Sequence, residues 1–288
     1  MRVLPFSLLL IVCAITFADD PVTEPRSSSP EQRLVFAKAA AESYQFRVGN
    51  SRGAEAKLVA SPLLRWNNKV VREDDGFLFL WTEEDKGRPL AGAQFFVVDK
   101  VWHHEFQSLS TKRFDARSNN DRDWTWQPKT AGLDFVEASD IDLPADSPAL
   151  RLRQMKALAE RFTAAVDMNE DFSTPEQLRL LTTPVYRYSS QDHLIVDGAI
   201  VAFVQGTNPE ILLIVEAVAK DGAIQWQYGF ARMSSYNLRV YQDARIVWKN
   251  VRVAVPTNDP ASPFQFRLAA QVDLSADVKI PAMVKDAK

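Results

Sequence analysis

The sequence predicts an α+β fold of two tandem repeats after a signal peptide, each a helix followed by an antiparallel β-meander. Three observations predict this fold class. Two segments open with Ser-Pro and then carry apolar residues at helical spacing. The segments after each helix are rich in aromatic and β-branched residues and are joined by short polar connections. Finally, the two halves of the chain align with each other at a nearly constant offset.

The first 18 residues have the composition of a secretory signal. Arg2 provides the positive start, an apolar run follows, and small residues precede a cleavage point after Ala18. The apolar run is roughly 15 residues long, shorter than the ~20 that a spanning helix needs. We therefore expect an exported protein, periplasmic or secreted, with no transmembrane segment in the mature chain. Lipid attachment at Cys13 is an alternative that Val12, a large residue before the cysteine, disfavours.

Composition limits the remaining possibilities. Cys13 is the one cysteine of the 288 residues, so the cleaved chain has none to form a disulfide. A chain of this size with 46% hydrophobic residues buries enough surface to be stable without one. The 34 basic and 37 acidic residues give a net charge of -3. Nucleic-acid binding normally requires a basic excess, so we expect no nucleic-acid partner.

The elements follow in order after the signal. Ser29, Pro30 and Gln32 have the spacing of a helix cap with a capping box, and a second helix begins at Ser147-Pro148. Asp221-Gly222 is a strong hairpin signal, and the short connections predict antiparallel pairing. The expected strands are 76–82, 90–98, 101–109, 198–204, 210–219, 224–233, 236–241 and 244–250. The expected domains are signal peptide 1–18, flexible spacer 19–29, first α+β repeat 30–133, acidic linker 134–146, second α+β repeat 147–256 and polar C-terminal tail 257–288.

The alignment of the two halves indicates an internal duplication. "PLLRW" from Pro62 and "PVYRY" from Pro184 start 122 residues apart, as do "GFLFLWT" and "GAIVAFV". "WHHEFQSLS" from Trp102 and "WQYGFARMS" from Trp226 share the pattern W-x-x-x-F-x-x-[LM]-S. The alternative is that two unrelated antiparallel sheets share aromatic residues and turns. The sequence leaves open whether the two repeats lie in one sheet or in two packed lobes.

Two histidines and a glutamate in "VWHHEF" are the candidate catalytic residues. Side chains alternate between the faces of a strand, so His103 and Glu105 share one face while His104 lies on the other. We expect the His104 face to be buried and His103 and Glu105 to face outward. The second half has "WQYGF" here and keeps no ligand, and a zinc site would need further donors. His103 and Glu105 are therefore weak catalytic candidates, and we predict no metal and no cofactor.

Trp124 and Trp126 in "DRDWTWQP" are the candidate ligand-binding residues. They occupy alternate positions next to acidic residues, so they are the best candidates for exposed tryptophans. The chain contains no nucleophile elbow, P-loop or dinucleotide fingerprint. We predict an exported, non-catalytic protein that binds an unidentified ligand or partner through its sheet or the cleft between the repeats. The alternative is a metal-assisted or acid–base hydrolase that uses His103 and Glu105.

Several sequence blocks resemble those of a known family. "FLWT", "GRP", "HEFQSLS", "LRQMKALAERF", "PVYRY" and "FVQGTNPE" occur here in this order. This arrangement is similar to that of a family of uncharacterised exported bacterial proteins, over roughly residues 30–250. The resemblance implies export and a single evolutionary unit. It implies no activity, cofactor or substrate.

Overall fold

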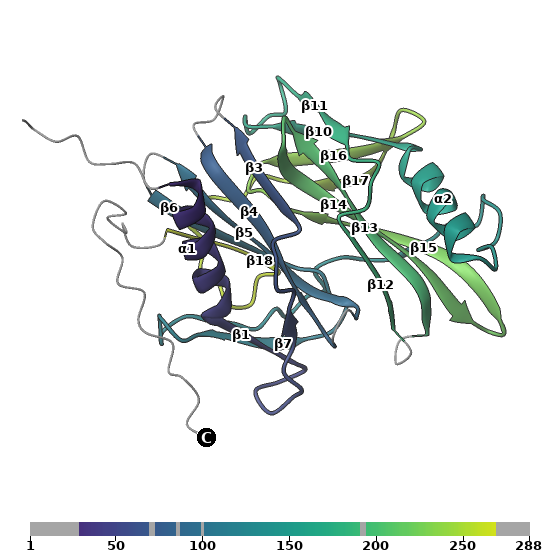
Figure 1. Ribbon diagram of the computed structural model, residues 1–288. Coiled ribbons are helices and arrows are strands. Elements are labelled where there is room, and N and C mark those ends of the chain that lie inside the picture. Colours follow the sequence, from purple (N-terminus) through teal and green to yellow (C-terminus); the bar gives the residue numbers. More distant parts are fainter. Residues whose placement is uncertain (1–28, 69–72, 85–86, 99–100, 191–193, 269–288) are drawn as a thin grey trace, which may run out of the picture. The chain divides into compact units, whose positions relative to one another are not determined.

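The structure, a computed structural model of the chain, consists mainly of antiparallel β-sheets (Figure 1). Of the described residues, 51% lie in strands and 11% in helices, so the prediction of an α+β fold class is wrong and the fold is β-rich. All the strand pairings described are antiparallel, as predicted. The signal peptide and most of the predicted spacer lie outside the described residues. The structure describes residues 29–68, 73–84, 87–98, 101–190 and 194–268.

The described residues form two helices and three sheets. The helices are α1 (Pro30–Glu42) and α2 (Pro148–Ala159). The small sheet has the order β1 (Tyr44–Val48), β7 (Phe114–Ser118), β8 (Thr125–Trp126). Sheet 1 has the order β18 (Phe264–Leu268), β6 (Val101–Ser108), β5 (Pro89–Val98), β4 (Glu73–Thr82), β2 (Lys57–Leu58), and β3 (Leu64–Asn68) also pairs with β4. Sheet 2 has the order β17 (Arg245–Asn250), β16 (Asn237–Gln242), β10 (Phe162–Asp167), β11 (Glu176–Leu180), β13 (Ile195–Gln205), β14 (Asn208–Lys220), β15 (Ala223–Arg232), β9 (Val136–Glu137), and β12 (Tyr186–Ser190) also pairs with β13.

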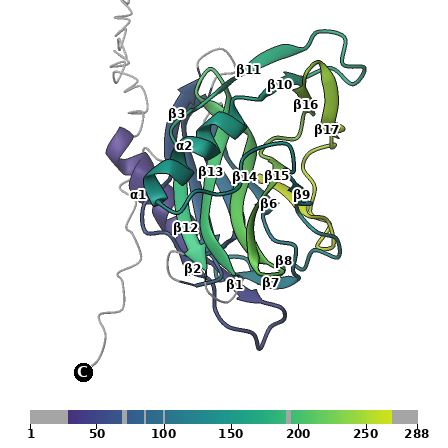
Figure 2. The same ribbon diagram turned by 90° about the vertical axis from the view of Figure 1, so that its right-hand side faces the viewer.

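The central strands are buried on both faces. On β13, Val201 belongs to the apolar core that also contains Met155 and Leu158 of α2, while its neighbour Ile200 belongs to the core shared with Leu78 of sheet 1. Sheets 1 and 2 therefore pack face to face, and α2 covers the outer face of sheet 2 (Figure 2). Burial on both faces explains the nearly continuous apolar runs of these strands.

The outer face of sheet 1 has an aromatic core. Phe36 of α1 lies against Trp102 with ring centroids 4.5 Å apart, and Tyr44 of β1 contacts Phe106 at 4.8 Å. Trp126 of the small sheet packs on Phe106 at 5.9 Å. The helix α1 and the small sheet thus cover the same face of sheet 1 and bury its aromatic side chains.

Both helices begin where the sequence predicts. Ser29 accepts a hydrogen bond from the backbone of Gln32, whose side chain accepts one from the backbone of Ser29, so the predicted capping box is confirmed. The Ser147 side chain caps α2 by accepting a hydrogen bond from the backbone N–H of Leu150. The contact of α1 with the sheet uses small residues, because Ala37 and Ala41 are fully buried.

An aspartate in each large sheet holds the start of one helix. Asp197 on β13 accepts hydrogen bonds from Arg151 of α2 and from Arg187 of β12. Arg187 also donates to the carbonyl of Pro148, the first residue of α2. In sheet 1 the same roles belong to Asp75, Arg33, Arg65 and Pro30. None of these arginine–aspartate contacts is predicted by the sequence analysis.

Two predicted non-repeat segments contain strands. Residues 136–137 of the predicted acidic linker form β9, which pairs with β15. Residues 264–268 of the predicted polar tail form β18, which pairs with β6, and residues 269–288 lie outside the described part of the chain. Phe264 and Phe266 of β18 are buried, so this segment belongs to the core of sheet 1.

Candidate binding surface

The strand β6 separates the two predicted histidine environments. Trp102 and Phe106 are fully buried under α1 and the small sheet, and His104 is 8% exposed on the same face. The Nδ1 atom of His104 lies 2.8 Å from the hydroxyl oxygen of Tyr44. Burial lowers the pKa of His104 to about 3, so its ring is neutral at physiological pH. His104 is therefore a hydrogen-bonded core residue, as the alternation predicts.

The opposite face of β6 is covered at Glu105, which corrects the prediction that this residue faces outward, while His103 is half-buried. Glu105 is 3% exposed, because sheet 2 packs against this face. The His103 ring stacks on Phe96 at 5.1 Å with an interplanar angle of 13°. Burial lowers the pKa of His103 and raises the pKa of Glu105 well above its usual value. A substrate in solution cannot reach this carboxyl group.

The connecting chain at Gly229 explains why the second sheet has no counterpart to Glu105. Phe96 pairs with His103, and in sheet 2 the corresponding cross-strand pair is Glu216 and Gln227. Gly229 occupies the position that corresponds to Glu105. A Cβ atom on Gly229 would lie 2.5 Å from Leu133, because the connecting chain crosses sheet 2 at this point. In sheet 2 the connecting chain at Leu133 and Asp134 occupies the space that the Glu105 side chain fills in sheet 1.

Trp124 and Trp126 are buried rather than exposed, which corrects the second site prediction. Trp124 is 5% exposed and Trp126 is fully buried. The indole of Trp124 donates to the side chain of Gln265 at 2.7 Å, and that of Trp126 donates to the carbonyl of Ser262 at 2.7 Å. The C-terminal segment that includes β18 thus covers both rings, and they serve the core of the small sheet.

Trp124 nevertheless borders a shallow depression of about 240 Å³. Arg267 is committed to internal contacts there: it forms an ion pair with Asp121, donates to the Tyr44 hydroxyl at 3.2 Å and lies 5.4 Å from the Trp124 ring centroid. Because these contacts use its guanidinium N–H groups and its charge, Arg267 has fewer donors left to bind a ligand. The residues that line the depression are Asp121, Asp123, Trp124, Thr125, Asn258, Pro260 and Arg267.

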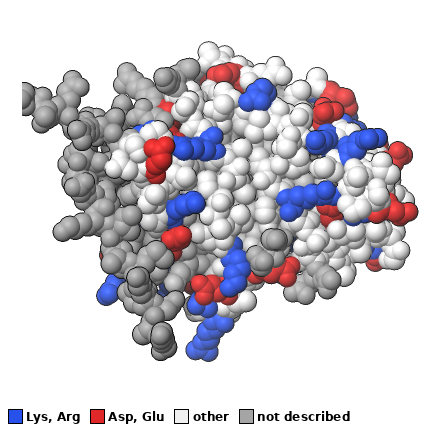
Figure 3. Space-filling view, in the orientation of Figure 1, with Lys and Arg blue, Asp and Glu red and all other residues white. Residues whose placement is uncertain are grey.

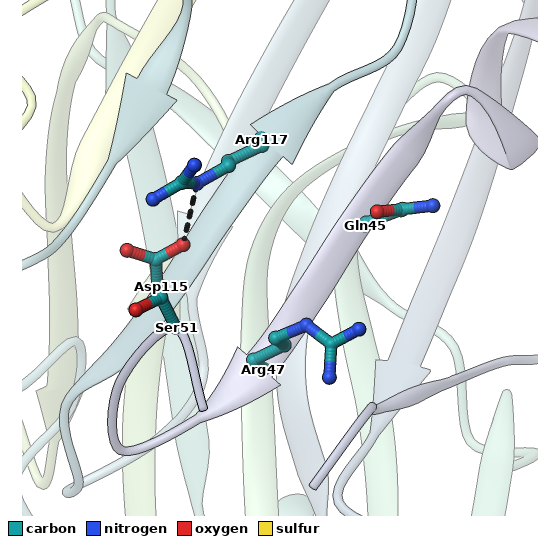
Figure 4. A pocket seen from close by; sticks show the side chains of 5 residues that line it. All are labelled: Gln45, Arg47, Ser51, Asp115 and Arg117. Atoms are coloured by element: carbon teal, nitrogen blue, oxygen red, sulfur yellow. Dashed lines mark hydrogen bonds and ion pairs between the residues drawn. The ribbon is translucent and has the colours of Figure 1, made fainter. Parts of the chain in front are cut away.

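A second depression, of about 200 Å³, lies on the outer face of the small sheet (Figure 4). Strand alternation turns Tyr44 and Phe46 of β1 into the core and leaves Gln45 and Arg47 outside. The antiparallel register then places Gln45 beside Arg117, and Arg47 beside Asp115 of β7. The residues that line this depression are Gln45, Arg47, Ser51, Asp115 and Arg117.

A buried carboxylate orients the more exposed arginine of this depression. Asp115 is 5% exposed and accepts hydrogen bonds from Arg117 Nε at 3.1 Å and from Gln127 Nε2 at 2.5 Å. The Arg117 side chain is 60% exposed. Arg47 is 38% exposed, donates to the carbonyl of Gly53 and forms a loose ion pair with Glu55 at 3.6 Å. Oriented guanidinium groups recognise carboxylate or phosphate oxygens, so this surface suits an anionic group.

The sequence analysis missed the residues of this depression. Strands β1 and β7 lie outside the predicted strands, although "YQFRV" and "FDARS" alternate apolar and polar residues. That alternation is the signal that could have found them. Over the face shown in Figure 3, charges of both signs are interspersed.

Comparison of the chain with protein-family models, with curated proteins and with solved structures gave no match. The resemblance to exported bacterial proteins therefore stays a prediction. Within the described part of the chain, no three His, Cys, Asp or Glu side chains lie close enough together to hold a metal ion. No helix in the described ranges combines the length and apolar character needed to cross a membrane.

Proposed function

We propose that the protein is an exported, non-catalytic binding protein that contacts an anionic group of a ligand or partner through the outer face of the small sheet. The observation that carries this proposal is the Arg117 side chain, which is 60% exposed and is held by the buried Asp115. Arg47 on the neighbouring strand adds a second cation to the same depression. A guanidinium group that is already oriented loses less side-chain entropy when it binds an anion.

The sheet surface is better supported than the two other sites that the sequence suggests. The space between sheets 1 and 2 is filled by a shared apolar core that includes Leu80, Ile200 and Ile214. A hydrolase that used His103 and Glu105 would need a path for substrate into this packed interface. The small-sheet depression is instead open to solvent at Arg117, and its one lining carboxylate, Asp115, already accepts hydrogen bonds from two donors.

Titration of ¹⁵N-labelled protein with citrate at low ionic strength tests this function. We expect the Nε–Hε signals of Arg47 and Arg117 and the backbone signals of β1 and β7 to shift together. Arg117→Gln should abolish the shifts. Arg122→Gln, at an exposed arginine of the neighbouring loop, is the matched control and should leave them intact. Shifts that are absent at millimolar citrate, or equally reduced by both variants, would refute the proposal, because general attraction between charges does not depend on one arginine.

We also infer that the two large sheets descend from one duplicated β-sheet unit. Two similarities support this origin. In each sheet the strand that carries the helix-binding aspartate pairs with the strand before it and the strand after it in the sequence. In sheet 1 β4 lies between β3 and β5, and in sheet 2 β13 pairs with β12 and β14. Gly76 and Gly198 also lie directly under the rings of Trp66 and Tyr188, with room for no Cβ atom. A homologue that carries only one such sheet would support this origin.

A further inference from the structure

Three carboxyl groups are buried where sheets 1 and 2 meet. Glu73 on β4 is 6% exposed, Glu105 on β6 is 3% exposed, and Glu210 on β14 is fully buried. The first two belong to sheet 1 and the third to sheet 2. Carboxyl groups are rarely buried so fully without a paired cation. The packing of the two sheets therefore depends on the charge of these groups.

One asparagine joins the carboxyl groups of the two sheets. The Asn208 side-chain amide donates to Glu73 at 3.2 Å and to Glu210 at 3.1 Å. The Trp66 indole donates to the other oxygen of Glu73 at 2.9 Å. Asn208 Oδ1 and Glu105 Oε1 are buried and have no hydrogen-bond partner among the described residues. A buried carboxyl group with an oxygen that receives no hydrogen bond, such as Glu105, favours its protonated, neutral form.

The cation nearest the cluster does not neutralise it. Arg232 on β15 is buried, and its guanidinium donates to the carbonyls of Ser234, Tyr236 and Val251. It also lies 4.6 Å from the ring centroid of Phe264. Three ionised carboxylates would therefore outnumber this single positive charge. Glu176 of β11 and Tyr236 lie close enough to interact electrostatically with Glu210, and Arg252 interacts with Tyr236. His103 lies two residues before Glu105 and therefore on the same face of β6.

We propose that the interface between sheets 1 and 2 is a proton-dependent lock, closed while the buried carboxyl groups hold protons and loosened when they lose them. In the closed form the protonated carboxyl groups are neutral, and Asn208 Nδ2 donates to one oxygen of Glu73 and one of Glu210. In the open form negative charges face each other in a site that excludes water. Repulsion and lost solvation then act directly on the contact between the sheets.

The direction of the pH dependence follows from the pKa values. Burial raises the pKa of Glu73 to about 7 and that of Glu210 to about 8, and it raises the pKa of Glu105 well above its usual value. The unfolded chain releases these protons near pH 4.5, so between that pH and about 8 the folded protein holds more protons than the unfolded chain. Stability therefore falls as pH rises through this window.

The two histidines of β6 act in the opposite direction at lower pH. Burial lowers their pKa values, so the unfolded chain binds more protons than the folded protein below about pH 6.5. At pH 6.5 each ring is still about half protonated in the unfolded chain, so the two histidines together raise the ratio of folded to unfolded protein by at most about fourfold between pH 6.5 and 8.5. This rise opposes the fall caused by Glu73 and Glu210 and is smaller than that fall.

Urea denaturation of the full chain at pH 6.5 and 8.5 tests the lock. For the wild type we expect the ratio of folded to unfolded protein to fall at least about tenfold between these pH values. Glu210→Gln has the shape of the protonated group and cannot ionise. We expect this variant to match the wild type at pH 6.5 and to be about tenfold more stable than the wild type at pH 8.5.

Glu137→Gln is the matched control, because this carboxylate of sheet 2 is 52% exposed. Its stability should follow the wild type at both pH values. A wild-type stability that is constant or rises between pH 6.5 and 8.5 would overturn the proposal. So would a Glu210→Gln variant whose pH profile runs parallel to that of the wild type. Hydrogen exchange at β4 and β14 that accelerates with pH beyond the intrinsic rate, and less in Glu210→Gln, would place the loosening at the interface.

Discussion

Replacing Asp197 with asparagine tests how the protein anchors α2. Asp197 accepts three hydrogen bonds, from Arg151 Nε at 3.0 Å and from Arg187 Nε and Nη2 at 2.8 and 2.5 Å. The side chains of Asp197 and Arg151 are only 6% and 8% exposed. Asparagine keeps the shape and one acceptor oxygen but removes the negative charge. The variant therefore leaves a buried guanidinium without its counter-ion.

The expected loss of stability follows from these exposures. Breaking a buried ion pair from one side costs about 3–5 kcal/mol. Arg187 is 35% exposed, so water partly replaces its lost partner and its share stays near the surface value of up to about 1 kcal/mol. Because asparagine keeps part of the hydrogen bonding, we expect a total loss of about 3 kcal/mol. For a chain of this size that corresponds to a fall in Tm of roughly 9 °C.

Urea denaturation followed by tryptophan fluorescence and circular dichroism measures this loss. Asp75→Asn is the parallel variant in sheet 1, where the arginines are 16% and 39% exposed, so we expect a smaller loss of about 2 kcal/mol. Asp140→Asn is the control, because this exposed ion pair with Arg161 should leave the denaturation midpoint unchanged. A loss for Asp197→Asn below about 1 kcal/mol, or no larger than that of the control, would refute the reasoning.

Three further outcomes follow from the packing. Arg88→Gln leaves the fully buried Glu216 without its two 2.9 Å ion-pair contacts and should cost about 3 kcal/mol, part of which Glu216→Gln restores in the double variant. Gly198→Ala places a Cβ atom 2.5 Å from the Tyr188 ring and should cost about 1–3 kcal/mol by thermal denaturation, and unchanged stability would show that the ring moves freely. The His104 ring signals should not titrate between pH 5 and 8 in NMR spectra, since burial lowers its pKa to about 3; a midpoint near pH 6.5 would contradict the buried, neutral ring.

Local signals in the sequence predict the local structure well. The Ser-Pro starts give both helices, and Asp221-Gly222 gives the β14–β15 hairpin, where both residues adopt positive φ. Such signals act within a few residues and need no tertiary context. The fold class is wrong because the two helices are short and the long central strands dominate the chain. The two helices contain 13 and 12 residues, whereas β14 alone contains 13 and the strands of three sheets make up most of the regular structure.

Contacts between distant segments account for the errors at the candidate sites. Alternation correctly separates His104 from His103 and Glu105, but it cannot show that a second sheet covers the other face of the strand. The burial of Trp124 depends on Gln265, which lies 141 residues further along the chain. Arg117 becomes a candidate only when its strand is paired with β1. In each case the deciding neighbour is far away in sequence.

The position of β18 makes the first half of the chain depend on the last residues described. Sheet 1 is built from residues 57–108, yet its edge strand is residues 264–268, added after all of sheet 2. During synthesis β6 therefore has an open edge, and the Trp124 indole has no acceptor, until the rest of the described chain has been made. A protein shortened to end after β17 would keep every residue of sheet 2 and lose the closure of sheet 1. The two halves resemble each other in construction, but the first one cannot be completed alone.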